Sequence, residues 1–172
     1  MTNPKTVSNR HGCAVITLPS DTEILITRVF DAPAELVFKA YTTPDLVRRW
    51  WGCETTEWLA CEIDLREGGR WRYVTRDGGV EVGFHGEYRE IAAPHRLVTT
   101  EMFEGAPDAD DADAPLNIVT FEEDDGVTTM KVLVQCVSRE QRAIILESGM
   151  ESGMQIAYNR LEDLAREMAD AG

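Results

Sequence analysis

The residues with the clearest capacity for chemistry in this 172-residue sequence are a histidine and a glutamate in the middle of predicted strands. His85 and Glu101 occupy positions where one of the two strand faces would carry an apolar residue. If both side chains point inward, burial would move their pKa values toward neutrality, and the pair could act as general acid and base. If both point outward, they are ordinary solvated residues of a sheet. The alternation leaves both interpretations open.

A second set of side chains combines aromatic rings with methionines, which together form a lining that adapts to ligands of several shapes. Trp50 and Trp51 are adjacent at the end of a short predicted helix, so both cannot face the same core. Trp50 is the better packing anchor and Trp51 the better lid. Plain core packing is the competing interpretation for the whole set. The candidate ligand-binding residues are Trp51, Trp71, Tyr73, Phe103, Phe121, Met130, Val132, Met150, Met154 and Tyr158.

The sequence contains no comparable motif for binding a metal or a cofactor. The four cysteines contain no Cys-x-x-Cys pair, and we expect reduced thiols rather than a metal site. The acidic loop at 108–113 lacks the central glycine and distal glutamate of a calcium-binding loop. No glycine-rich phosphate-binding motif precedes a helix. We therefore expect no metal and no cofactor.

The composition narrows the choice of partners. The chain has 17 basic and 31 acidic side chains, a formal net charge of -14, which disfavours nucleic acid and anionic membranes. The 43% of hydrophobic residues suffices for one ordinary core. No uncharged apolar stretch approaches the roughly 18 residues that a membrane span needs, and the N-terminus does not resemble a signal peptide. We expect a cytoplasmic protein without membrane insertion, as a monomer or a homodimer.

The elements that must position these residues follow from periodicity. A β-branched strand at 23–30 leads into helices at 33–41 and 44–51, with Asp31 and Thr43 as expected caps. From 54 to 137 the pattern has period two and turn residues, which indicates an antiparallel meander. Ser138 opens a further helical turn or two, and a longer helix runs from 150 to about 169.

This order predicts an α+β protein, in which a curved antiparallel sheet of about six to seven strands wraps around a long C-terminal helix. We expect an N-terminal extension at 1–21, with a possible edge strand at 14–18, and a single domain at 22–170. A wide sheet around one helix leaves space that side chains do not fill, so an internal cavity is expected.

Several segments, in order along the chain, resemble the SRPBCC superfamily, and within it small bacterial proteins related to the C-terminal domain of the activator of the heat-shock-protein-90 ATPase. The likeness covers about 22–169 and implies the helix-grip fold of the birch-pollen allergen and of START domains. The segments that carry it are 30–38, 43–46 with 50–52, 66–72, 86–91 with 94–98, and 148–154.

The resemblance implies less about function, because the superfamily includes ligand carriers, hormone sensors, polyketide cyclases and aromatases, and co-chaperone domains. We expect a small hydrophobic or aromatic molecule to bind in the cavity, without a reaction. One alternative is an enzyme of cyclase, aromatase or hydrolase type that uses His85 or Glu101. The other is a co-chaperone-like adaptor that binds a protein through its surface.

Overall fold

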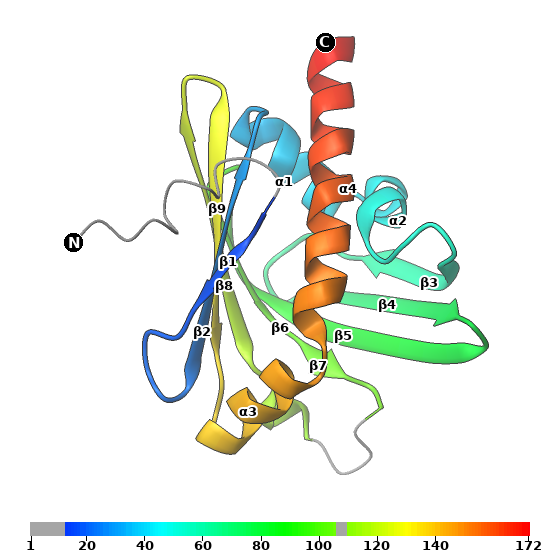
Figure 1. The fold of residues 1–172 in the computed structure, drawn as a ribbon, viewed down its shortest axis with the longest axis vertical. Helices are drawn as coiled ribbons and strands as arrows, with labels where there is room; N and C mark the ends of the chain where they lie inside the picture. Colours follow the sequence, from blue (N-terminus) through cyan, green and yellow to red (C-terminus); the bar gives the residue numbers. More distant parts are fainter. Residues whose placement is uncertain (1–12, 106–109) are drawn as a thin grey trace.

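The computed structural model describes residues 13–105 and 110–172 (Figure 1). The first twelve residues of the predicted extension and the start of the acidic loop lie outside the described residues. The helices are α1 (Ala34–Thr42), α2 (Pro44–Trp50), the 3-10 turn η2 (Asp111–Asp113), α3 (Arg139–Glu147) and α4 (Met150–Ala171). The strands are β1 (Val15–Thr17), β2 (Glu23–Phe30), β3 (Glu57–Ile63), β4 (Arg70–Asp77), β5 (Val80–Ala92), β6 (Arg96–Thr100), β7 (Met102–Phe103), β8 (Leu116–Asp124) and β9 (Val127–Gln135).

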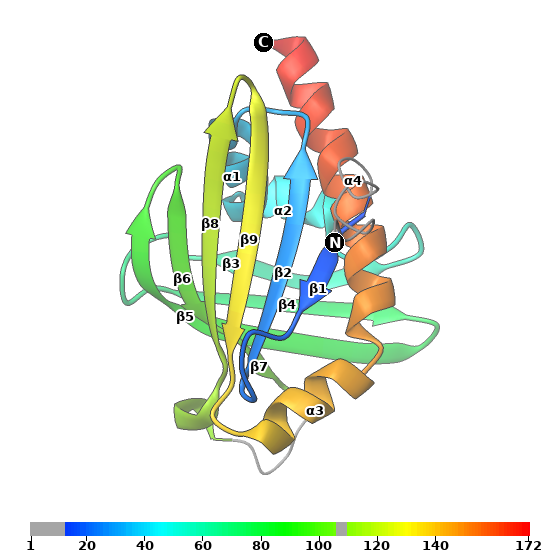
Figure 2. The ribbon, with the colours of Figure 1, turned by 60° about the vertical axis from the view of Figure 1, so that its left-hand side comes forward.

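The described strands form one antiparallel nine-stranded sheet in the order β1-β2-β9-β8-β6-β5-β4-β3, with β7 also paired to β5. The sheet bends so that β3, β4 and β5 pass behind α4 while β1, β2, β8 and β9 rise beside it (Figures 1 and 2). This arrangement confirms the predicted α+β fold with a sheet wrapped around a C-terminal helix. The strand count exceeds the prediction because β1 joins the edge and the expected strand at 96–103 is broken at Glu101.

Of the caps expected for α1 and α2, Asp31 is wrong, and Thr43 is confirmed in its position only. Pro33 occupies the N-cap of α1, and the backbone N–H of Ala34 donates to the Glu123 carboxylate of β8 at 2.7 Å instead of to Asp31. Thr43 stands at the N-cap of α2 without a side-chain bond. The start of α1 is therefore satisfied by a strand distant in sequence, which local patterns do not reveal.

The cap predicted for α3 is confirmed. The Ser138 hydroxyl accepts a hydrogen bond from the backbone N–H of Gln141 at 3.1 Å. The Gln141 side chain in turn accepts from the N–H of Val137 at 2.9 Å.

The burial of helix α4 differs along its length. Its buried residues begin only at Ala157, whereas Met150 and Met154 in its first turns are partly buried. Helix α3 buries no residue completely. The middle turns of α4, from 157 to 165, thus belong to the core, and its N-terminal turns are less buried. The buried residues of α4 are Ala157, Tyr158, Leu161, Glu162, Leu164 and Ala165.

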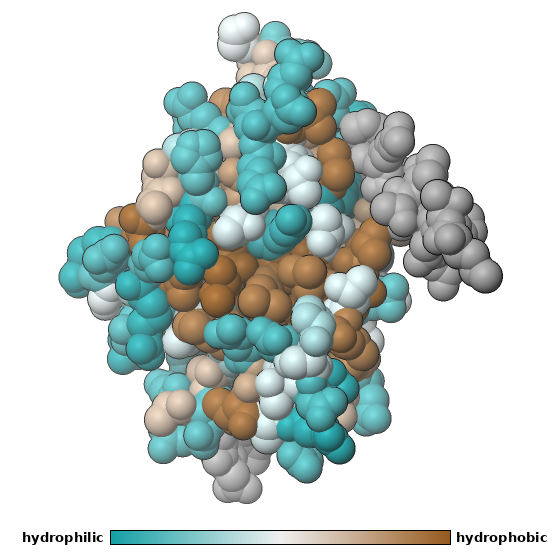
Figure 3. All heavy atoms as spheres, turned by 90° about the vertical axis from the view of Figure 1, so that its left-hand side faces the viewer, coloured by the Kyte–Doolittle hydropathy of each residue, from teal (hydrophilic) through white to brown (hydrophobic). Residues whose placement is uncertain are grey.

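The outer face of the sheet, opposite α4, carries an apolar row across four strands. Leu25, Leu133, Ile118 and Val98 are successive cross-strand neighbours on β2, β9, β8 and β6. Figure 3 shows apolar side chains gathered in the middle of this face. None of the described helices has the length and hydropathy to span a membrane.

A buried ion pair fastens α4 to the sheet. Arg28 points inward from β2 and is 1% exposed, and its guanidinium donates to Glu162 at 3.0 Å and to Asn159 at 2.9 Å. The second oxygen of Glu162 accepts from the Asp31 N–H at 3.3 Å and lies 3.5 Å from the Arg166 guanidinium. These bonds offset the cost of removing both charges from water.

We predict that Glu162→Gln lowers the free energy of unfolding by about 3–5 kcal/mol, because it leaves the Arg28 charge buried without its counterion. Denaturant unfolding measures this loss. The double variant Arg28→Met with Glu162→Leu is expected to be more stable than Glu162→Gln, since it buries no unpaired charge.

Glu167→Gln is the matched control on the same helix. Its partner Arg49 and Glu167 itself are both more than half exposed, and exposed pairs contribute about 0–1 kcal/mol. Equal losses for Glu162→Gln and Glu167→Gln would contradict a stabilising role for the buried pair.

Candidate functional site

The two ionisable candidates lie on opposite faces of the sheet. His85 is opposite Arg72 in the register of β4 and β5, and both side chains point outward. The neighbouring pair Tyr73 and Phe84 points inward, where each ring contacts Trp51. Glu101 belongs to the inner face, as argued below. The structure therefore does not bring His85 and Glu101 together as an acid and base pair.

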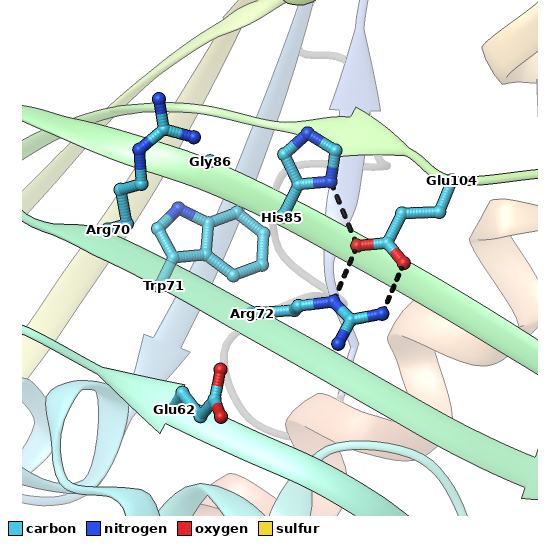
Figure 4. A pocket seen from close by; sticks show the side chains of 7 residues that line it. All are labelled: Glu62, Arg70, Trp71, Arg72, His85, Gly86 and Glu104. Carbon is cyan, nitrogen blue, oxygen red and sulfur yellow. Dashed lines mark hydrogen bonds and ion pairs between the residues drawn. The ribbon is translucent and has the colours of Figure 1, made fainter.

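His85 is part of an outer ion cluster, which we define as Arg72, His85, Glu104 and Asp111. The Arg72 guanidinium donates two hydrogen bonds of 2.9 Å to the Glu104 carboxylate. The two imidazole nitrogens of His85 lie 2.9 Å from Glu104 and 2.8 Å from Asp111. Figure 4 shows Glu104 between Arg72 and His85. The cluster attaches the loop after β7 to the outer surface of β5.

The charges in this cluster stabilise one another. The hydrogen bond from Arg72, aided by His85, lowers the pKa of Glu104 to about 2. Hydrogen bonds to Asp111 and Glu104 raise the pKa of His85. A protonated imidazole donates from both nitrogens, which fits its position between two carboxylates. Each charged group of the outer ion cluster is paired with another member of the cluster. We therefore describe the cluster as a structural latch, which means that it holds Glu104 and Asp111 against β4 and β5.

Two pockets open on the surface near these elements. One, of about 280 Å³, lies beside the outer ion cluster and is lined by Glu62, Arg70, Trp71, Arg72, His85, Gly86 and Glu104 (Figure 4). The other, of about 470 Å³, is lined by Glu35, Phe38, Lys39, Thr42, Thr43, Ala93 and Pro94. Within 13–105 and 110–172, no group of three or more His, Cys, Asp or Glu side chains is arranged to hold a metal ion.

Glu101 occupies the break between β6 and β7. Leu97 belongs to the inner core and Phe103 contacts the inward Phe84, so alternation along the chain places Glu101 on the same inner face. Its backbone N–H donates to the Pro115 carbonyl at 3.1 Å, which keeps this segment next to β8. The Glu101 carboxyl thus lies on the inner face, directly after the end of β6.

Asn117 is the neighbour of this carboxyl on β8, where it pairs with Thr99 of β6. It shares the inner face with Val119 and Phe121 by alternation. Burial raises the pKa of Glu101, and the Asn117 side chain partly opposes this by hydrogen bonding to the carboxylate. The Asn117 Oδ1 atom is buried and has no hydrogen-bond partner among the described residues.

Tyrosines surround these two polar groups. Burial raises the pKa values of Tyr41, Tyr73 and Tyr158, and the charge of Glu101 raises all three further, which indicates that they share one interior with it. With the partly buried methionines of α4 they form what we call the interior site. Its members are Tyr41, Tyr73, Glu101, Asn117, Met150, Met154 and Tyr158.

An aromatic wall extends from the interior site toward the surface. The Trp51 ring meets Tyr73 at 5.1 Å and Phe84 at 6.0 Å between ring centroids, both edge to face. Phe84 in turn lies 5.4 Å from Phe103, which is 45% exposed. Trp51 is half-buried. These rings run from the interior to the rim, as a lid residue and its neighbours would.

The remaining predicted lining residues are held by core packing. Phe121 is fully buried against Phe38 and Tyr41, at 5.6 and 5.8 Å between ring centroids. Met130 and Val132 are also buried in the core. Trp71 is buried with its indole N–H donating to the Thr100 carbonyl at 3.2 Å.

Trp50 packs as expected for an anchor. It stacks on Tyr41 at 5.4 Å, and its indole N–H donates to the Ala40 carbonyl at 2.8 Å.

Sequence reasoning missed Tyr41 and Asn117. The alternation over 116–122 contains the signal for Asn117, because it puts a polar amide on the face of Val119 and Phe121. Tyr41 gives no such signal, since a tyrosine in an amphipathic helix is ordinary.

A family model described as "Activator of Hsp90 ATPase homolog 1-like protein" matches residues 31–166. No curated protein matches the chain. Protein Ms6760 from Mycobacterium smegmatis is 26% identical, with a TM-score of 0.78 over 88% of this chain and 96% of that one.

Two further solved structures share the fold. A protein from Rhodobacter sphaeroides is 24% identical, with a TM-score of 0.79 over 90% of this chain and 99% of that one. PFC0360w, an HSP90 activator from Plasmodium falciparum, is 21% identical, with a TM-score of 0.62 over 83% of this chain and 95% of that one.

We predict that the contribution of His85 to stability is present in acid and lost in base. A histidine whose pKa is raised by folding stabilises the folded state fully below its unfolded pKa of about 6.5, and this contribution disappears as the pH rises through the folded value. The difference in unfolding free energy between the wild type and His85→Gln should be larger at about pH 5 than at about pH 9.

The NMR titration of the His85 imidazole provides the direct measurement. Asp111→Asn is the matched variant and should lower the pKa of His85, since it removes one of the two carboxylates. A His85 pKa that is the same in both proteins would contradict the latch.

Proposed function

Because the chain belongs to the family of activator of Hsp90 ATPase homolog 1-like proteins, we propose that it uses the helix-grip fold to bind a small hydrophobic or aromatic molecule in the interior site. The ligand would lie between the inner face of the sheet and the first turns of α4. No cofactor takes part in this proposal.

The main support for the proposal is that polar side chains lie on the inner face of the sheet, where a protein core normally has apolar ones. Glu101 and Asn117 face inward from central strands, surrounded by tyrosines. A core selected for stability alone avoids a buried carboxyl and an unpaired amide oxygen, because each costs free energy. Such groups are expected where a ligand is to be oriented.

The methionines of α4 support the same location. Met150 and Met154 pack against the core while remaining partly exposed. Methionine is flexible and polarizable, so it adapts to ligands of different shape. Gly149, in the left-handed region at φ 81°, separates α3 from α4 and lets the chain turn sharply at the start of this helix.

A binding role explains the geometry better than catalysis by the predicted pair. His85 lies on the outer face with its two ring nitrogens next to carboxylates. Glu101 therefore stands without a histidine partner in the interior site. An acid and base pair would need both side chains within reach of one substrate, and His85 and Glu101 lie on opposite faces of the sheet.

We predict that Met154→Trp lowers the affinity for 2-naphthol at least about tenfold, since the indole would fill the space that the ligand needs. The matched control is Ile156→Trp, because Ile156 lies on the same helix and is 48% exposed. Titration calorimetry measures the affinity, and circular dichroism checks that both variants fold.

Native mass spectrometry of the protein purified from its own host complements this test. A bound molecule that disappears on organic extraction identifies the natural ligand. Unchanged 2-naphthol affinity in Met154→Trp would count against a site beneath the first turns of α4.

A further inference from the structure

The interior site holds an unsatisfied hydrogen-bond acceptor. The Asn117 Oδ1 atom is buried, and no described residue donates to it. The amide side of the same residue is directed to the Glu101 carboxyl. A buried acceptor that lacks a donor costs free energy, and a ligand that brings the donor recovers it.

The second polar group near this acceptor is the carboxyl of Glu101. Burial raises the pKa of this carboxyl, and its oxygens can accept a hydrogen bond from a ligand donor. An anionic ligand group would meet two oxygens there and gain no cation among the tyrosines. A cationic group would have to give up its water in an interior built mostly of aromatic rings and methionines.

We propose that Glu101 and Asn117 form a polar anchor that selects apolar or aromatic molecules carrying a neutral hydroxyl or amide N–H group. The donor of the ligand bonds to Asn117 Oδ1, and its ring lies against the aromatic wall and the α4 methionines. This inference rests on the proposed function, because it assigns the ligand class for the same site.

The anchor and the aromatic wall contribute differently to binding: the wall supplies contact area and the anchor supplies selectivity. Trp51, Tyr73 and Phe84 supply apolar contact area that does not distinguish one aromatic ring from another. Hydrogen-bonding groups discriminate strongly, because a ligand lacking the matching group leaves the polar atoms of the site unpaired.

The test compares three probes of the same ring size: naphthalene, 2-naphthol and 2-naphthoate. We expect the wild-type protein to bind 2-naphthol about tenfold more tightly than naphthalene, and 2-naphthoate more weakly than either. Titration calorimetry gives the three dissociation constants. This ranking needs no variant, so it tests the anchor even where a substitution impairs folding.

Two variants assign the ranking to the anchor. Asn117→Leu has a similar size and no acceptor, so it should bind 2-naphthol and naphthalene about equally. Glu101→Gln replaces the ionisable carboxyl with an amide that cannot become negative, so it should retain the preference for 2-naphthol and bind 2-naphthoate about tenfold better than the wild type does. Glu122→Gln, on the exposed part of β8, is the matched control and should change nothing.

The outcomes separate the anchor from the binding site. Equal wild-type affinities for naphthalene and 2-naphthol would overturn the anchor and leave the proposed function standing. A 2-naphthol preference that survives in Asn117→Leu would also overturn the anchor. Failure of all three probes to bind would overturn the proposed function together with the anchor.

Discussion

The position of α4 depends on the buried ion pair between Arg28 and Glu162. Both charges are removed from water, and their attraction and hydrogen bonds offset that cost, although the Arg28 Nε atom has no hydrogen-bond partner among the described residues. The pair therefore contributes less to net stability than to placement, because only one position of α4 satisfies both side chains. Asn159 and the backbone of Asp31 complete the arrangement from the same helix and from the end of β2. The pair thus fixes the middle turns of α4 against the sheet.

The burial of α4 differs along its length. Near Leu161 and Leu164 the helix is fully packed, and apart from Arg28 and Thr128 the inward side chains of β2 and β9 are buried and apolar. Near Met150 and Met154 the helix is only partly buried. The buried ion pair and the proposed binding site therefore lie on different turns of the same helix.

The sequence predicts the order of elements well because hydrophobic periodicity is a local property. The alternation of Ile24, Ile26 and Phe30 identifies β2 correctly, yet the same alternation hides Arg28, whose partner lies 134 positions later. The directions of His85 and Glu101 likewise depend on strand register and on the break between β6 and β7, which no local pattern specifies. The cap predicted for α1 is wrong for the same reason, because the residue that accepts from the helix start is Glu123, on a strand distant in sequence. Met150, Met154 and Trp51 were predicted as lining residues from their residue types alone, and their role in binding stays a prediction.

Strand β5, at 13 residues, pairs with β6 in one half of the sheet and with β4 and β7 in the other. β5 therefore belongs both to the half of the sheet that includes β6 and to the half that carries the aromatic wall. Gly86 on this strand leaves room for Trp71, since a Cβ there would lie 2.5 Å from the indole nitrogen. Tyr73 and Phe84 of the wall lie on β4 and β5, whereas Arg28 lies on β2, with β9, β8 and β6 between β2 and β5. The fold therefore carries the ion pair that positions α4 and the aromatic wall on separate strands, which β5 joins into one sheet.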